Sequence, residues 1–218
     1  MCKVNIDISK IAETEVGKNT ANWIYRVIGA PIENGIGLLF ADALKEKRIQ
    51  NIIKLRNETD KFTIHNSKQL PLSFAYKLLD KASLEENDNM IKKWAELLAN
   101  SMDKDFNGKI RKIYIDILDS LEPIDAKVLE IIASKKQSID PADYFSNEEK
   151  DNINISVDSL QSLNLIMEDF DEESVPIEPY DWDAPREKYV RGYNNGKYYL
   201  TELGNSFLTA VNRKENQK

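Results

Sequence analysis

The strongest constraint on the fold is the stretch from Lys77 to Asn100, whose pattern is that of two abutting helices with a short joint. Ser83 and Glu86 have the spacing of a capping box, in which the serine hydroxyl accepts from a helix amide and the glutamate reaches back. This spacing predicts that a helix begins at Leu84. Apolar residues then recur at helical spacing and predict one buried face, made of Met90, Ile91, Trp94, Ala95, Leu97 and Leu98. Nothing in this motif is catalytic, so it constrains the scaffold and not the chemistry.

The rest of the first 134 residues shows the same helical spacing. Helices are predicted over Thr20–Ile28, from Pro31 to about Ile64, from Pro71 to the Ser83 joint, from about Asn107 to Leu121, and from Pro123 to the SKKQS run. The residues predicted to face inward include Trp23, Ile24, Val27, Phe74, Leu78, Leu79, Ile110 and Ile113. This spacing is typical of a helical bundle.

From Ile139 onward the pattern changes to short elements. Ser156 is expected to cap a short helix, Leu165–Met167 and Tyr198–Leu200 to form strands, and Thr201 to cap a last helix. The residues between the strands, about 168–197, are expected to form an irregular acidic wing. We therefore predict a mainly α protein, with a helical bundle over residues 1–121 and a small winged-helix-like α+β domain over residues 122–218.

Composition is that of a globular protein, since 41% of the 218 residues are hydrophobic and 31% are charged. The single cysteine, Cys2, excludes an internal disulfide and suits a reducing compartment. No start of the signal-peptide type is present, and the most apolar region, Trp23–Leu44, is interrupted by Arg26, Glu33 and Asp42. We expect a cytoplasmic protein without a transmembrane segment. An amphipathic surface helix in Trp23–Leu44, and with it a membrane-active toxin, stays an alternative.

The net charge of −7 is unevenly distributed. Residues 1–121 hold 19 basic and 17 acidic residues, a net charge of +2, whereas residues 122–218 hold 11 and 20, a net charge of −9. A negative domain gains no general attraction to phosphate, so bulk charge does not favour nucleic acid as the partner.

Three blocks of sequence carry a resemblance to a known family: GLLFADALKEKRIQNIIKL, KASLEENDNMIKKWAELLANSMD and IYIDILDSLEPIDAKVLEII. In their order and spacing, over roughly Gly29 to Ala133, the chain resembles the abortive infection alpha (Abi-alpha) family of helical bacterial proteins. The resemblance implies a role in defence against phage, or in a phage-carried counterpart, and it implies no chemistry. The residues shared with the family are expected to be packing and capping positions. In the scaffold they comprise Ser83, Glu86, Trp94, Leu97, Leu98, Pro123 and Asp125.

The inventory of reactive side chains does not favour an enzyme. His65 is the only histidine and follows a polar helix end, and Cys2 lies at the chain terminus. One histidine and one cysteine cannot build a structural zinc site. Glu148, Glu149 and Lys150, with Asp143 upstream, resemble the end of a metal-dependent nuclease signature, but they lie in a predicted helix and not on strands. We expect no catalytic residue, no metal and no cofactor, although the carboxylates do not fully exclude metal chemistry.

The acidic wing is one candidate binding surface. Among its carboxylates lie the apolar residues Val175, Ile177, Tyr180 and Trp182. Aromatic anchors in a charged surround are typical of interface hot spots, so these residues are candidates for binding a protein partner. The alternative is a solvated loop.

A basic stripe on the predicted long helix is the other candidate, formed by Lys45, Lys47, Arg48, Lys54 and Arg56. If the protein touches nucleic acid or an anionic lipid, this stripe is the expected anion site. The alternative is an ordinary solvated helix face.

The function predicted from these patterns is a non-enzymatic interaction module in phage defence that recognises a protein partner. Self-association through long helices is also expected. A winged-helix DNA-binding regulator is the first alternative, but the predicted recognition helix SVDSLQSLN has no Lys or Arg. An acidic wing would also repel a phosphate backbone.

Overall fold

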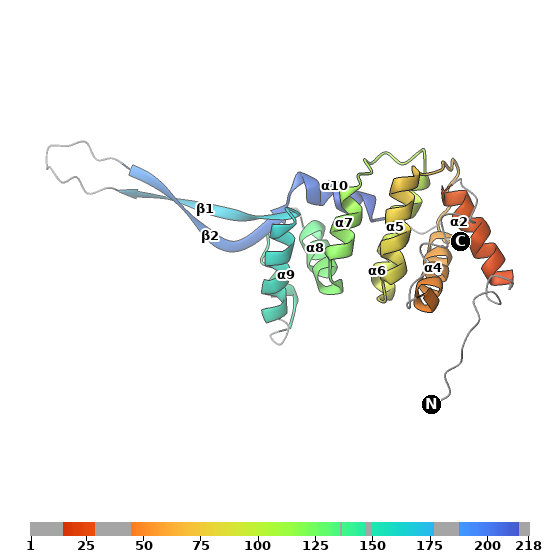
Figure 1. Cartoon of the computed structure of the whole chain (residues 1–218). Coiled ribbons are helices and arrows are strands. Elements are labelled where there is room, and N and C mark those ends of the chain that lie inside the picture. Colours follow the sequence, from red (N-terminus) through yellow and green to blue (C-terminus); the bar gives the residue numbers. More distant parts are fainter. Residues whose placement is uncertain (1–14, 29–44, 136, 147–149, 177–187, 214–218) are drawn as a thin grey trace, which may run out of the picture. The chain divides into compact units, whose positions relative to one another are not determined.

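The computed structural model describes residues 15–28, 45–135, 137–146, 150–176 and 188–213 (Figure 1). Within these residues the protein is mainly helical, with eight α-helices, one short 3-10 helix and one two-stranded antiparallel sheet. This confirms the prediction of a mainly α protein with a small β component. The winged-helix arrangement of the second part stays a prediction.

The chain divides into two compact units. One consists of Met1–Pro123 together with Ser206–Lys218, and the other of Ile124–Asn205. The last residues of the chain therefore belong to the same unit as the first. The predicted division into domains at Leu121 stays a prediction.

The first unit is built from helices (Figure 1). They are α2 (Glu15–Ile28), α4 (Lys45–Thr59), α5 (Leu72–Leu84), α6 (Asp88–Met102), α7 (Ile113–Ser120) and the second half of α10 (Glu202–Ala210). Of these helices, α5 contacts α2, α4, α6 and α7. Helix α4 packs against both α5 and α6, α2 packs on α4 and α5, and α7 packs on α5.

The hydrophobic core of this unit confirms the predicted buried faces. In α6 every residue of the predicted face is at most 1% exposed, namely Met90, Ile91, Trp94, Ala95, Leu97 and Leu98. The predicted inward residues of α2 and α5 are buried as well: Trp23, Ile24, Val27, Phe74, Leu78 and Leu79. Burial of these apolar side chains is the main stabilising term for such a unit.

The predicted capping box is wrong. Helix α5 continues to Leu84, and Ser83 is a fully buried residue in its last turn. Helix α6 begins at Asp88, and its N-cap is Asn87, whose side chain accepts from the amides of Asn89 and Met90. Asparagine caps a helix as well as serine does, and here the serine hydroxyl already has partners inside the core.

Asn87→Ala is therefore expected to lower the free energy of unfolding by about 1 kcal/mol, because two amides of α6 lose their acceptor. The measurement is chemical denaturation followed by circular dichroism. Glu86→Ala is the matched control, since the exposed Glu86 takes no part in the cap and should leave stability almost unchanged. A larger loss for Glu86→Ala than for Asn87→Ala would contradict this assignment of the cap.

Two predicted helices are shorter than expected. Helix α4 ends at Thr59 and not near Ile64, because the backbone turns at once and brings Phe62 into the core, where it is 6% exposed. The predicted stretch from Pro31 to Leu44 lies outside the described residues. Helix α7 begins at Ile113 and not near Asn107, and Ile113 is 47% exposed, so its predicted inward position is wrong. The segment before α7 contains Gly108, a weak helix former.

The second unit contains α8 (Pro123–Ser134), the short helix η2 (Pro141–Tyr144), α9 (Lys150–Ser162), the strands β1 (Ile166–Pro176) and β2 (Lys188–Leu200), and the start of α10. Helix α8 confirms the predicted start at Pro123. Ser156 does not cap a helix, because it lies within α9 and is 1% exposed. A buried mid-helix position explains why the cap prediction failed there.

The wing is not an irregular loop over the described residues. Strands β1 and β2 are 11 and 13 residues long and form one antiparallel hairpin (Figure 1). The predicted strands covered only the base of this hairpin. Most of the hairpin sequence shows no apolar alternation by which the strands could be recognised.

The predicted cap of the last helix is confirmed. Thr201 immediately precedes α10, and its Oγ1 accepts from the amide of Gly204 at 2.9 Å. Gly204 lies so close to the preceding segment that a Cβ there would be 2.1 Å from the carbonyl oxygen of Leu165. Glycine is therefore required for the close approach of α10 to the residue that precedes β1.

Candidate protein-binding surface: the acidic hairpin

The β1–β2 hairpin is the most distinctive surface of the second unit. The register pairs Ile166 with Leu200 at the base and Pro176 with Lys188 at the far end. An irregularity lies between Asp169 and Phe170, whose partners are Lys197 and Asn194. Gly196 lies at this point with a φ of +74°, which an L side chain rarely adopts. A bulge of this kind increases the local twist of the ribbon.

The base of the hairpin is anchored to the rest of its unit. Ile166 is 1% exposed, and Gln161 of α9 donates to Glu168 at 3.1 Å. The hydroxyl of Ser138 donates to the carboxylate of Asp169. These contacts hold the first residues of β1 in place, so the hairpin starts from a fixed root.

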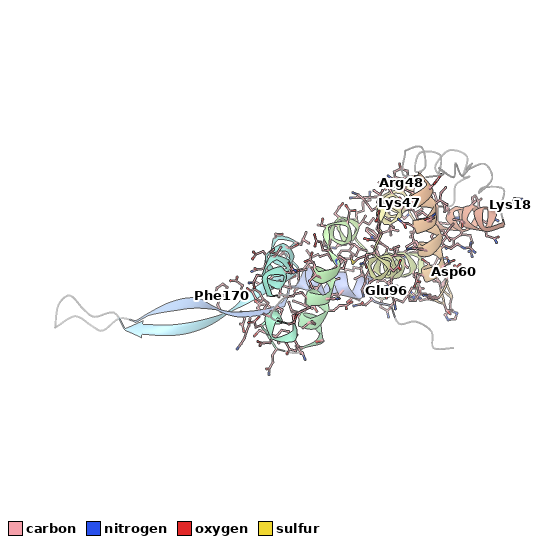
Figure 2. All side chains as sticks on the ribbon, turned by 90° about the horizontal axis from the view of Figure 1, so that it is seen from below. Lys18, Lys47, Arg48, Asp60, Glu96 and Phe170 are labelled. Atoms are coloured by element: carbon pink, nitrogen blue, oxygen red, sulfur yellow. The ribbon has the colours of Figure 1, made fainter. Side chains whose placement is uncertain are left out.

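The hairpin exposes large apolar side chains at its root and just beyond it. Met167, Phe170 and Tyr199 are 46%, 56% and 41% exposed, and Phe170 lies on the ribbon away from the helices of its unit (Figure 2). Such residues beside carboxylates resemble the core and rim of a protein interface. Sequence reasoning missed these three, because it looked for anchors only in the middle of the wing.

The predicted partner-binding residues lie farther along the chain. Ile177, Tyr180 and Trp182 are outside the described residues. Val175 belongs to β1, where its register partner is Tyr189. The role of these four residues in binding stays a prediction.

The predicted basic stripe lies on α4, where Lys47 and Arg48 are neighbours (Figure 2). Besides Arg48, which pairs with Asp80, three of its members form ion pairs with nearby carboxylates. The pairs are Lys47–Glu86 at 2.5 Å, Lys54–Asp88 at 2.7 Å and Arg56–Asp60 at 3.3 Å. A hydrogen bond from Lys47, together with its charge, holds the pKa of Glu86 below its usual value.

Arg48 is the least accessible member of the stripe. Its guanidinium donates to the carboxylate of Asp80 at 2.9 Å and to the hydroxyl of Ser83 at 2.7 Å. Asn51 donates to the backbone carbonyl of Ser83 at 3.0 Å. These contacts join α4 to α5 and give Ser83 a structural role. Anion binding by the stripe stays a prediction, and the ion pairs disfavour it, because a ligand would have to displace carboxylates.

The other scaffold residues have packing roles. Trp94, Leu97 and Leu98 lie in the core of α6, and Asp125 is buried in the first turn of α8 at 4% exposure. Pro123 is the first residue of α8, a position that suits proline because its missing amide would have no helical partner.

A polar clamp at the end of the chain was not predicted. Arg213 donates to Asp103 at 2.6 Å, to the side chain of Asn100 at 2.9 Å and to the carbonyl of Thr63 at 2.8 Å. Burial raises the pKa of Asp103, but the hydrogen bond from Arg213, the amide of Asp105 and the Arg213 charge outweigh burial and hold the pKa below its usual value. The contact joins residues 110 positions apart, so no local pattern signals it.

The residues considered for catalysis do not form a site in the described part of the chain. His65 is exposed, while Cys2, Glu148 and Glu149 lie outside the described residues. Among the residues described, no three His, Cys, Asp or Glu side chains gather in a way that could hold a metal ion. Within the same part of the chain no helix has both the length and the apolar character needed to span a membrane.

The fold and its surfaces define a class of mainly helical proteins with an acidic hairpin. Two helices of the fold are joined by a polar contact, which Arg48 of α4 makes with Asp80 and Ser83 of α5. The model of the abortive infection alpha family matches residues 45–211, which is more than half of the chain. The chain belongs to this family, as the resemblance in its sequence predicted. No curated protein and no solved structure matches the chain.

Proposed function

We propose that this protein is a non-enzymatic interaction module of a bacterial phage-defence system of the abortive infection type, or of its phage-carried counterpart. It acts by recognising a protein partner, and the acidic hairpin is the recognition surface. The family membership supports the role in abortive infection. The observation that carries the choice of surface is the exposure of Met167, Phe170 and Tyr199 on a ribbon with an anchored root.

Charge favours a protein over DNA as the partner. In the winged-helix interpretation α9 would be the recognition helix and the hairpin the wing. The only basic residue of α9 is Lys150 at its first position, and β1 carries five carboxylates and no basic residue. Duplex DNA binding depends on neutralising phosphates with Lys and Arg, and α9 and β1 together hold one such residue while β2 holds three.

The test shortens the hairpin without removing its root. Replacing Glu172–Gly192 by Asn-Gly closes the strands with a two-residue turn just beyond the Asp171–Tyr193 register pair. In a bacterial host where the full chain protects against phage, the shortened chain that also carries Met167→Ser, Phe170→Ser and Tyr199→Ser should lose protection and lose its co-purifying partner. Its thermal unfolding should change little, because these three side chains are exposed.

A matched variant, Lys47→Ala, removes an exposed charge of the first unit and should keep both protection and partner. Full protection by the shortened chain would contradict the proposal. The alternative function, a DNA-binding regulator, is tested by titrating labelled duplex DNA with the intact chain at low salt. Tight binding would favour that alternative.

A further inference from the structure

The outer edge of β1 has no strand beside it in the described part of the chain. On one side β1 pairs with β2 along its whole length, and among the described residues no strand pairs with its other side. Helix α9 packs near the root, where Gln161 donates to Glu168. From Asp169 onward the edge therefore presents backbone amides and carbonyls, the groups through which another strand is added to a sheet.

The two edges of the hairpin are not equivalent. At the root of β2, Tyr198 forms two backbone hydrogen bonds with Ile139, at 3.1 Å and 2.8 Å. Edge strands are usually protected by features such as proline and β-bulges, and β1 has few of them. Its one proline, Pro176, is its last residue, and the two extra residues at the irregularity belong to β2. The feature that does protect the edge of β1 is its negative charge. This charge repels acidic strands but attracts basic ones.

The register leaves part of that charge without a basic partner. Strand β1 carries Glu168, Asp169, Asp171, Glu172 and Glu173, whereas β2 carries Lys188, Arg191 and Lys197. Two carboxylate residues of β1 are opposed by a basic residue, Asp169 by Lys197 and Glu173 by Arg191. Asp171 is opposed by Tyr193 and Glu172 by Gly192. Opposite charges on adjacent strands stabilise their pairing, so a third strand with Lys or Arg at these positions would be favoured.

Apolar groups at the same edge add to this preference. Phe170 and Met167 are three residues apart in β1, hence on opposite faces of the ribbon, and both are about half exposed. A neighbouring strand with alternating apolar and basic side chains presents its apolar side chains on one face, where they would cover one of these two residues.

We propose that the β1 edge of the hairpin takes up an extended, Lys- or Arg-rich segment of a partner protein as a third strand. The inference rests on the proposed function for its claim that a partner exists, and it adds the place and the chemistry of recognition. Main-chain hydrogen bonds would supply affinity, and the carboxylates would select basic segments.

The test uses the intact chain and a fluorescein-labelled octapeptide of alternating lysine and valine as the probe. Fluorescence anisotropy should show saturable binding that weakens as salt is raised. The same peptide with alternate backbone amides methylated keeps its charge but cannot pair along one edge, so it should bind at least tenfold more weakly. A glutamate–valine octapeptide should not bind.

The variant Asp171→Asn/Glu172→Gln should weaken binding of the lysine–valine peptide. The control Asp143→Asn/Asp158→Asn, which removes two exposed carboxylates outside the hairpin, should not. Equal binding of the methylated and unmethylated peptides would overturn the proposal, because a charged surface alone would explain it. No binding of either peptide, or self-association of the chain that occupies the edge, would also overturn it.

The two proposals fail in different ways. If the peptide does not bind while the shortened hairpin abolishes phage protection, the edge inference is wrong and the proposed function stands. If the peptide binds but shortening the hairpin leaves protection intact, the β1 edge does bind basic strands and the proposed function is wrong.

Discussion

Gly204→Ala is expected to destabilise the protein by about 3 kcal/mol, at the upper end of what overpacking costs. Inside a helix this substitution normally stabilises by about 1 kcal/mol, so the sign is reversed here. The reason is the 2.1 Å distance from the new Cβ to the carbonyl oxygen of Leu165, which is a backbone atom and cannot rotate away. Moving α10 outward would also stretch the 3.0 Å hydrogen bond from the Thr201 amide to that oxygen.

The matched control is Gly108→Ala. Its Cβ would lie 2.3 Å from the ring of Phe106, which is a partly exposed side chain that can turn aside. We expect a much smaller loss of stability there. Urea denaturation of both variants gives the comparison, and a Gly204→Ala variant as stable as the natural chain would show that α10 and the Leu165 segment are not tightly packed.

Arg213→Ala is expected to cost about 2 kcal/mol, somewhat less than a fully buried ion pair, because the Arg213 and Asp103 side chains are 17% and 11% exposed. Removal of the Arg213 side chain leaves the nearly buried carboxylate of Asp103 without its cation. It also removes the hydrogen bond that Arg213 donates to the carbonyl of Thr63. Arg213→Lys should restore part of the stability, since it keeps the charge but cannot reach three acceptors at once. An Arg213→Ala variant with unchanged unfolding would contradict a structural role for the clamp.

The clamp also predicts how stability depends on pH. Asp103 has a lowered pKa in the folded state, so it binds a proton less readily there than in the unfolded chain, where its pKa is about 3.9. Its contribution is present above about pH 4 and is lost as the pH falls through the folded-state pKa. In Arg213→Ala burial dominates and should raise the pKa of Asp103 above its unfolded value, so this carboxyl should no longer contribute to the loss of stability in acid. Carboxyl chemical shifts from NMR titration report this directly.

Local sequence patterns were enough to locate most helices of the first unit. The apolar faces of α2, α5 and α6 repeat every three to four residues, and burial of those faces is what packs the helices together. Capping was harder to predict. Ser83 and Asn87 both have the chemistry of an N-cap, and the choice between them depended on Arg48, which is distant in sequence and occupies the Ser83 hydroxyl.

Unlike the helices of the first unit, most of the hairpin could not be located from local sequence patterns. Only its root, near Leu165 and Leu200, has the apolar character by which a strand is recognised, and the rest is held by cross-strand backbone pairing that composition does not reveal. The predicted candidate surface lies in the segment that forms the hairpin, and its role in binding stays a prediction, whereas the exposure of Met167, Phe170 and Tyr199 became evident only from the structure.

By itself, the sequence determined that this chain is mainly helical and that its acidic residues are concentrated in the second part, because periodicity and composition are local properties. The match of its sequence blocks to the abortive infection alpha family was likewise visible without the structure. The tertiary structure decided which polar side chains are available. It showed that four cations of the basic stripe have carboxylate partners, that Arg48 and Ser83 join α4 to α5, and that Arg213 binds Asp103. Such pairings depend on distances between residues far apart in sequence, and only the packed core sets those distances.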